Sequence, residues 1–240
     1  MQAQLRIRRF NPENGAKPWW GDYVLDDVKD TDSVLDLLHR IKWEVDGSLA
    51  LRRSCAHGVC GSDAMRINGV NALACKMLVQ RLKNDEHTVK IQIEPILGLS
   101  VLKDLIVDME PFFEHYRSVQ PYYINDTPTP EDGRERRQSQ ADRARFDDTT
   151  KCILCAACTT SCPSFWANDK YVGPAAIVQA HRFIFDSRDQ GAEQRLESVG
   201  DSFGVWRCRT VFNCTSACPR DIEVTKAIAE IKTVLTTGNI

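Results

Sequence analysis

The chain has 240 residues, 42% hydrophobic and 27% charged, which is the composition of a folded globular protein with one large domain or two ordinary ones. Its formal net charge of −2 and its lack of a polybasic run exclude a basic surface for nucleic acid or for direct docking on anionic lipid. No run approaches the roughly 18 consecutive apolar residues of a membrane-spanning helix. Three arginines in residues 1–10 precede no apolar run, so we expect no secretory signal. Strand-like alternation begins almost at once, so we expect no uncleaved organellar transit peptide either.

Cysteine is the residue type that sets this composition apart, with ten copies. Disulfide frameworks are typical of short secreted chains, and this chain is neither short nor visibly secreted. In a reducing compartment, clustered thiols more often bind soft metal centres. The cysteines fall within residues 55–75, 152–162 and 208–218, and we expect them to be metal ligands.

The first half of the chain predicts strands packed around one helix. Polar and apolar residues alternate over 4–8 and over 89–93, the period of a half-buried strand. Asn68-Gly69 is a hairpin turn signal between two further short strands. Asp32 or Ser33 can cap a helix, and the apolar residues that follow share one helical face: Val34, Leu38, Ile41 and Val45.

The second half of the chain predicts helices. Pro174 fits the first position of one helix, and Gly238 fits the end of another. Residues 118–148 are polar, with mixed charges over 134–145, and we interpret them as a connection between domains or a surface excursion. The fold class that we expect is α+β, with an N-terminal domain over residues 1–105 and an α-helical domain over residues 106–240.

The first cysteine group has the spacing of a plant-type 2Fe–2S run, with one substitution. Four residues separate Cys55 from Cys60, and the third cysteine of such a run would come two residues further on. Asp63 occupies that position, and Cys75 follows. Carboxylate is a harder donor than thiolate but can bind iron. We therefore predict that Cys55, Cys60, Asp63 and Cys75 hold a 2Fe–2S cluster.

Two features of this loop bear on that prediction. Gly58 and Gly61 let the backbone adopt positive φ and bring its N–H groups near the cluster sulfurs. The alternative for Asp63 is a solvated loop acid, with Ser62, His57 or an exogenous group completing the ligands. A Rieske-type site needs two histidines on one iron, and the loop holds no second histidine.

The other two groups follow the bacterial ferredoxin run Cys-x2-Cys-x2-Cys-x3-Cys-Pro. Its residues are all present at Cys152, Cys155, Cys158, Cys162 and Pro163. The run repeats at Cys208, Cys214, Cys218 and Pro219. Val211 stands where the remaining cysteine is expected, and valine cannot bind iron.

In two-cluster ferredoxins the fourth cysteine of each run binds the other cluster. This rule predicts a 4Fe–4S cluster on Cys152, Cys155, Cys158 and Cys218. It leaves three thiolates for the last cluster, which predicts a 3Fe–4S cluster on Cys162, Cys208 and Cys214. Together the three ligand sets use every cysteine. The alternative for the last site is a 4Fe–4S cluster with an open iron, against which the apolar Val211 counts.

A plant-type ferredoxin domain followed by a two-cluster domain resembles the iron–sulfur subunits of succinate dehydrogenase. The resemblance rests on the cysteine-bearing segments 54–63 and 152–155 and on the segments 163–166 and 186–189, and it covers essentially the whole chain. It implies a β-grasp fold for the N-terminal domain and a bacterial-ferredoxin-like fold for the helical one.

The resemblance also implies a function in electron transfer. A flavoprotein partner would oxidise succinate at its FAD, and electrons would pass through the 2Fe–2S, 4Fe–4S and 3Fe–4S clusters to a membrane quinone. It further implies membrane-anchor subunits, whose haem content stays open, and a peripheral position on the cytoplasmic face of a bacterial inner membrane. The alternatives are a fumarate reductase subunit, a freestanding multi-cluster ferredoxin and a zinc-stabilised module.

By the same resemblance, quinone-binding residues would be Pro163, Ser164, Trp166 and Arg209. Relatives commonly carry a second tryptophan where this chain has Ala167, and histidine where it has Arg209. Arginine can still donate a hydrogen bond to a quinone oxygen. The departures predict a different quinone, menaquinone among them, or a rearranged pocket. The alternative for Trp166 is packing against the anchor subunits.

Overall fold

The computed structural model describes residues 1–240 except 16, 84 and 86. The chain divides into two compact units. The first consists of Met1–Met109 and Ile153–Ser161, and the second of Glu110–Cys152 and Cys162–Ile240. The strands lie in the first unit, which also contains one α-helix, and the other α-helices lie in the second, so the expected α+β class is confirmed. No helix in the described part of the chain has the length and apolar character to cross a bilayer.

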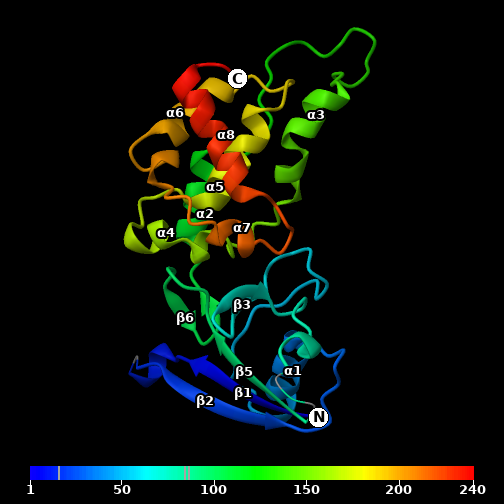
Figure 1. The fold of residues 1–240 in the computed structure, drawn as a ribbon, viewed down its shortest axis with the longest axis vertical. Coiled ribbons are helices and arrows are strands. Elements are labelled where there is room, and N and C mark those ends of the chain that lie inside the picture. Colours follow the sequence, from blue (N-terminus) through cyan, green and yellow to red (C-terminus); the bar gives the residue numbers. More distant parts are fainter. Residues whose placement is uncertain (16, 84, 86) are drawn as a thin grey trace. The chain divides into compact units, whose positions relative to one another are not determined.

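A five-stranded mixed sheet forms the centre of the first unit, with strand order β2-β1-β5-β3-β4 (Figure 1). Strand β1 pairs antiparallel with β2 and parallel with β5. The predicted alternation is confirmed: Leu5 and Ile7 are buried in β1 and Ile91 is buried in β5, while the residues next to them within each strand are exposed or partly exposed. The strands are β1 (Gln2–Arg9), β2 (Trp19–Leu25), β3 (Ala64–Ile67), β4 (Val70–Leu73) and β5 (Thr88–Glu94), with β6 (Val101–Lys103) and β7 (Ile106–Val107) forming a separate pair.

Helix α1 (Val34–Arg40) supplies much of the apolar core of the first unit. Its predicted cap is confirmed: Ser33 Oγ accepts from the backbone N–H of Asp36, and the Asp36 carboxylate accepts from that of Ser33. A π-helical turn, Ile41–Val45, follows. The prediction that Val45 shares the buried face is wrong, because a π turn holds more residues than an α turn and rotates Val45 outward, where it is 58% exposed.

The hairpin signal at Asn68-Gly69 is confirmed. Ile67 lies opposite Val70 in the β3–β4 register, so the turn has two residues. Both have positive φ, 46° and 84°, as a type I′ turn requires. Strand β4 therefore runs directly into the segment that carries Cys75.

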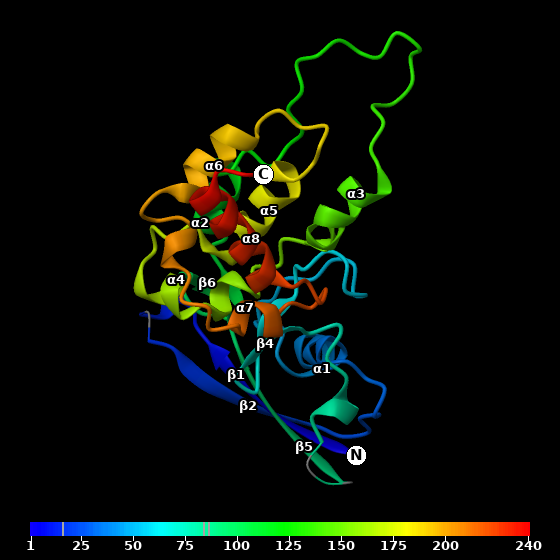
Figure 2. The same ribbon diagram turned by 45° about the horizontal axis from the view of Figure 1, so that its top comes forward.

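The second unit is built from seven α-helices. Helix α5 is buried along nearly all its length and packs against α8 (Figure 2). Pro174 lies in the first turn of α5, one residue past the predicted first position, because the helix begins at Gly173. Gly238 ends α8 with a φ of 73°, as predicted. The helices are α2 (Glu110–Ser118), α3 (Gln140–Asp147), α4 (Pro163–Ala167), α5 (Gly173–Ile184), α6 (Ala192–Gly200), α7 (Asn213–Ser216) and α8 (Val224–Thr237).

The polar segment 118–148 lies entirely in the second unit. Figure 2 shows most of it as a long loop between α2 and α3. Helix α3 begins at Gln140 with Ser139 as its cap and buries Phe146. The domain boundary at residues 105 and 106 stays a prediction.

Candidate metal centres

All ten cysteines lie in the described part of the chain, and none of them forms a disulfide bond. Three are buried and seven are partly exposed, and the thiolate of cysteine is a soft donor for metals. Among the described residues, no group of three or more His, Cys, Asp and Glu side chains is arranged to hold a single metal ion. Cluster ligands bind different irons and need not converge on one point.

The loop that carries Cys55 folds its backbone around the Cys55 sulfur. The backbone N–H groups of His57, Val59 and Cys60 donate to Cys55 Sγ, with N···S distances of 3.5, 3.4 and 3.3 Å. These hydrogen bonds lower the pKa of the Cys55 thiol to about 6. Thiolate is the form that binds iron. The loop is therefore already arranged to stabilise negative charge on this sulfur.

Two glycines make this conformation accessible. Gly58 and Gly61 have φ of 83° and 70°, the left-handed region that disfavours side chains, as the sequence predicted. A Cβ on Gly61 would lie 2.6 Å from Cys155 Cβ, and one on Gly58 would lie 2.7 Å from Lys76 Cδ. The first contact involves a rigid part of its neighbour and the second the flexible stem of a lysine.

Asp63 is buried next to Cys75. Its side chain is 2% exposed, and the backbone N–H of Cys75 donates to Asp63 Oδ2 at 2.6 Å. The other oxygen, Asp63 Oδ1, is buried and meets no hydrogen-bond donor among the described residues. The alternative of a solvated loop acid is therefore wrong. A buried carboxylate oxygen without a donor is unfavourable unless a cation binds it, so the site fits a metal here.

The chemistry around Cys75 and Cys60 agrees with this reading. Burial, with the Asp63 carboxylate alongside, raises the pKa of Cys75 to about 12. A bound cation would release that proton by stabilising the thiolate. The hydroxyl of Ser62 lies 3.1 Å from Cys60 Sγ, and His57 Nδ1 lies 2.7 Å from the Cys55 carbonyl oxygen. Both alternative ligands are thus engaged in other contacts.

In the second unit, Cys162, Cys208 and Cys214 line one small cavity. Cys162 directly precedes α4, Cys208 follows a 3₁₀ turn, and Cys214 lies in α7. Burial raises the pKa of Cys214. Thr225, in the first turn of α8, has its hydroxyl oxygen 3.6 Å from Cys214 Sγ. Cys162 thus lies at the same cavity as Cys208 and Cys214, although it is far from them in the sequence.

Val211 lines this same cavity, as does Phe212. The loop that carries them has positive φ at Thr210 (55°) and Phe212 (65°), and it leaves Val211 51% exposed. The position at which a fourth thiol is expected is therefore at the cavity, occupied by an apolar side chain. These residues fit a cluster held by three cysteines.

Three of the four predicted quinone residues line the Cys162 cavity. They are Pro163, Ser164 and Arg209. Trp166 is not among the lining residues and is 48% exposed. Tyr171 is fully buried and also lines the cavity. The sequence analysis missed Tyr171, and the turn around it carries no signal that would have indicated it.

The predicted 4Fe–4S ligands are divided between the units. Cys155 and Cys158 belong to the first unit, while Cys152 and Cys218 belong to the second. Their assignment stays a prediction from motif spacing.

Asn71, on β4, is a functional candidate that the sequence analysis missed. Its side-chain amide donates to the carbonyl oxygen of Ala157 at 3.2 Å and to Thr160 Oγ1 at 2.8 Å. These hydrogen bonds fasten the cysteine-bearing segment 153–161 to the sheet of the first unit. An asparagine in a strand gives no sequence signal for such a role.

In comparison with known proteins, each half of the chain matches a family model of its own. Residues 4–114 match the family model of a 2Fe-2S iron-sulfur cluster binding domain, and residues 144–219 match that of a 4Fe-4S dicluster domain. Together with the spacing of the cysteines, these matches define an iron–sulfur electron-transfer protein.

Relatives identify its family. The chain is 44% identical over 237 residues to the succinate dehydrogenase iron-sulfur subunit of Paracoccus denitrificans, covering 96% of this chain and 89% of that protein. It is 44% identical over 229 residues to that of Coxiella burnetii, covering 95% and 94%. A chain of the Mycobacterium smegmatis Sdh1 complex in the apo form matches with a TM-score of 0.83 and 27% identity, covering 99% and 97%. This chain belongs to the family of succinate dehydrogenase iron–sulfur subunits and serves electron transfer in that enzyme.

Proposed function

We propose that this chain carries electrons from the FAD of a flavoprotein partner to a membrane quinone, in the direction of succinate oxidation. When bound, the clusters supply one-electron carriers whose potentials the protein adjusts. The observation that carries the proposal is the spacing of the ten cysteines, none of which forms a disulfide bond and which divide into three ligand sets with none left over. The chain's own contribution is to hold those donors and control their surroundings.

For the 2Fe–2S cluster we assign Cys55, Cys60, Asp63 and Cys75 as ligands. The buried Asp63 Oδ1 without a donor supports the carboxylate as a ligand. The backbone N–H groups around Cys55 support a loop that stabilises thiolate charge.

For the 3Fe–4S cluster we assign Cys162, Cys208 and Cys214, supported by the cavity that the three share and by Val211 at its wall. For the 4Fe–4S cluster we assign Cys152, Cys155, Cys158 and Cys218 from the motif spacing alone.

Membership of the family implies a flavoprotein and membrane-anchor subunits as partners, and a peripheral association with a membrane. We propose that this membrane is the bacterial inner membrane, that the chain lies on its cytoplasmic face, and that the anchors hold it there. We place the quinone near Pro163, Ser164 and Arg209, which share the cavity of the last cluster, with Trp166 as a further candidate.

The test is a redox titration of the purified complex followed by EPR, together with metal and sulfide analysis. We expect three distinct cluster signals and roughly nine irons per chain, two, four and three in the respective clusters. Two 4Fe–4S centres would contradict the assignment at Val211. Zinc in place of iron would contradict the function as a whole.

A further inference from the structure

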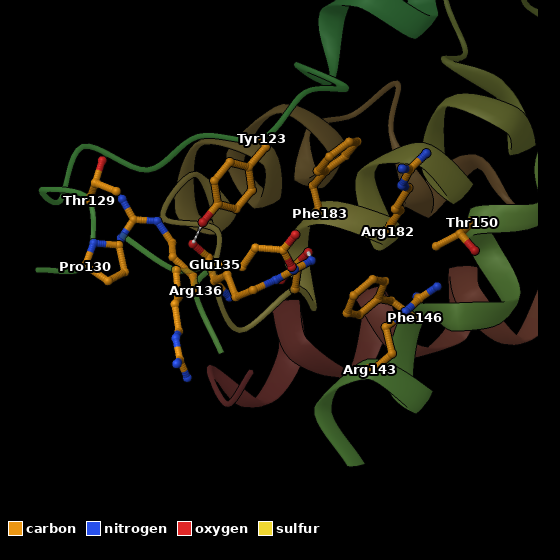
Figure 3. Close-up of a pocket in the computed structure, with 13 residues that line it drawn as sticks. Tyr123, Thr129, Pro130, Glu135, Arg136, Arg143, Phe146, Thr150, Arg182 and Phe183 are labelled. Atoms are coloured by element: carbon orange, nitrogen blue, oxygen red, sulfur yellow. Dashed lines mark hydrogen bonds and ion pairs between the residues drawn. The ribbon is translucent and has the colours of Figure 1, made fainter. Parts of the chain in front are cut away.

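A cavity of about 650 Å³ lies within the second unit, and none of its lining residues is a cysteine (Figure 3). Its walls come from the loop between α2 and α3, from α3, from the C-terminal part of α5 and from the turn that follows α5. This volume is in the range of pockets that bind small organic molecules. Electron transfer through the clusters does not require this cavity.

The loop that forms one wall is fastened near both ends to the turn after α5. The backbone N–H of Ile124 donates to Asp189 Oδ2 at 2.9 Å. Near the other end, the Gln138 side chain donates to Asp186 Oδ1 at 2.9 Å. The wall is therefore formed before any ligand arrives. Less conformational entropy of the loop is then lost when a ligand binds.

The charge of the lining is strongly positive. Five arginines line the cavity against two acids: Arg134, Arg136, Arg143, Arg182 and Arg188 against Glu135 and Asp186. Much of this charge has no acidic counterpart inside the cavity.

Two of these arginines are already paired. Arg188 binds Asp186 through two guanidinium nitrogens at 2.9 and 2.7 Å, and Arg143 pairs with the exposed Asp147 at 2.6 Å. By contrast, Arg134 and Arg182 form no ion pair with any described residue. Two guanidinium groups are thus available for an anion, and guanidinium matches phosphate with two parallel hydrogen bonds.

Aromatic rings complete the lining. Phe146 and Phe183 are buried at 3% and 8% exposure, while Tyr123 is 45% exposed (Figure 3). The Arg182 guanidinium lies over the Phe183 ring, 5.1 Å from its centroid. The half-exposed ring of Tyr123, beside guanidinium groups that have no acidic partner among the described residues, suits a ligand with both a flat ring and a phosphate.

We propose that this cavity binds a nucleotide, with its phosphates on Arg134 and Arg182 and its base against the aromatic side chains. The proposal stands apart from the electron-transfer function and does not depend on the cluster assignments. It assigns a further kind of ligand to a subunit that serves electron transfer.

The experiment is equilibrium dialysis of the purified complex against labelled ATP, with adenosine and inorganic pyrophosphate as competitors. We expect saturable binding of one ATP per chain. Pyrophosphate should displace the labelled ATP less effectively than unlabelled ATP does, and adenosine should displace it least. The variant carrying Arg134→Gln and Arg182→Gln should bind ATP about tenfold or more weakly, because it loses two charged hydrogen-bonding groups. Arg137→Gln, in the same loop but outside the lining, should bind as the unchanged protein does.

The EPR spectrum of each variant serves as the check on folding, because the clusters are distinct from this cavity's lining. Should the double variant not assemble, Arg134→Gln alone, at an exposed position, is expected to weaken ATP binding by about threefold or more. No saturable ATP binding, which would also follow if a partner subunit filled the cavity, overturns the proposal. Equal binding by the arginine variants overturns it as well. If pyrophosphate bound as tightly as ATP, the base would contribute nothing to binding, and the proposal that the ligand is a nucleotide would be overturned.

Discussion

The Cys55 loop of the first unit and the Cys162 cavity of the second surround their sulfur atoms in different ways. Around Cys55, three backbone N–H groups from the next five residues point at one sulfur. Around Cys214, burial and a threonine hydroxyl from another helix surround the sulfur. The first arrangement is local and depends on backbone conformation. The second depends on residues that only the packing of helices brings together.

The largest change should follow from restoring the fourth thiol of the second site with Val211→Cys. Because position 211 lines the cavity, the new thiolate can hold the iron that three cysteines leave unbound. We expect the 3Fe–4S EPR signal of the oxidised complex to be lost, a 4Fe–4S signal to arise on reduction, and the potential to fall. Val211→Ala, which changes the same position without supplying a thiol, is the control and should keep the 3Fe–4S signal. Unchanged cluster content in Val211→Cys would contradict the geometry of the site.

The next largest effect is expected at the first site, from Asp63→Cys. A thiolate in place of the buried carboxylate changes the donor to one iron, so the potential of the 2Fe–2S cluster should shift clearly while the cluster stays bound. Redox titration of its EPR signal measures the shift. Asp27→Cys, an exposed acid in the same unit, should leave it unchanged. A potential unaltered by Asp63→Cys would remove Asp63 from the ligands.

The local character of the first site can be tested through its two glycines. Alanine at a left-handed φ costs about 1–2 kcal/mol at either position. Gly61→Ala adds a contact of 2.6 Å with Cys155 Cβ, whereas Gly58→Ala meets only the movable Lys76 side chain. We expect Gly61→Ala to lower the thermal stability and 2Fe–2S content of the complex more than Gly58→Ala does. Equal losses would show that backbone conformation alone decides the effect.

The smallest effects should come from single hydroxyl groups near the sulfurs. Ser62 lies beside Cys60, and Thr225 lies beside Cys214. A hydrogen bond to a ligand sulfur stabilises the more negative, reduced cluster, so its removal lowers the potential. Ser62→Ala should therefore lower the 2Fe–2S potential modestly, and Thr225→Val that of the 3Fe–4S cluster.

Each of these hydroxyl variants is the control for the other, because their clusters give separate EPR signals. Thr237→Val, at the exposed end of α8, should change neither potential. A shift in the wrong cluster, or in both, would indicate a general disturbance of the complex rather than the loss of one hydrogen bond.

Local patterns in the sequence were sufficient for much of the fold, and they alone predict the ligand sets. Alternation predicted β1 and β5, the Asn68-Gly69 turn predicted the β3–β4 hairpin, and Ser33 predicted the start of α1. Motif spacing alone divided the ten cysteines into ligand sets. These signals work because turns, caps and cysteine motifs depend on residues only a few positions apart.

Other features depend on residues far apart in the chain, and only the tertiary structure decided them. Nothing near Asp63 in the sequence indicates that one of its oxygens is buried without a donor. The hydroxyl of Thr225 reaches Cys214 because α8 packs against α7. The unpaired Arg134 and Arg182 meet in one cavity because a loop is fastened back onto the turn after α5. Burial and long-range contacts come from packing the whole chain, which no local pattern encodes.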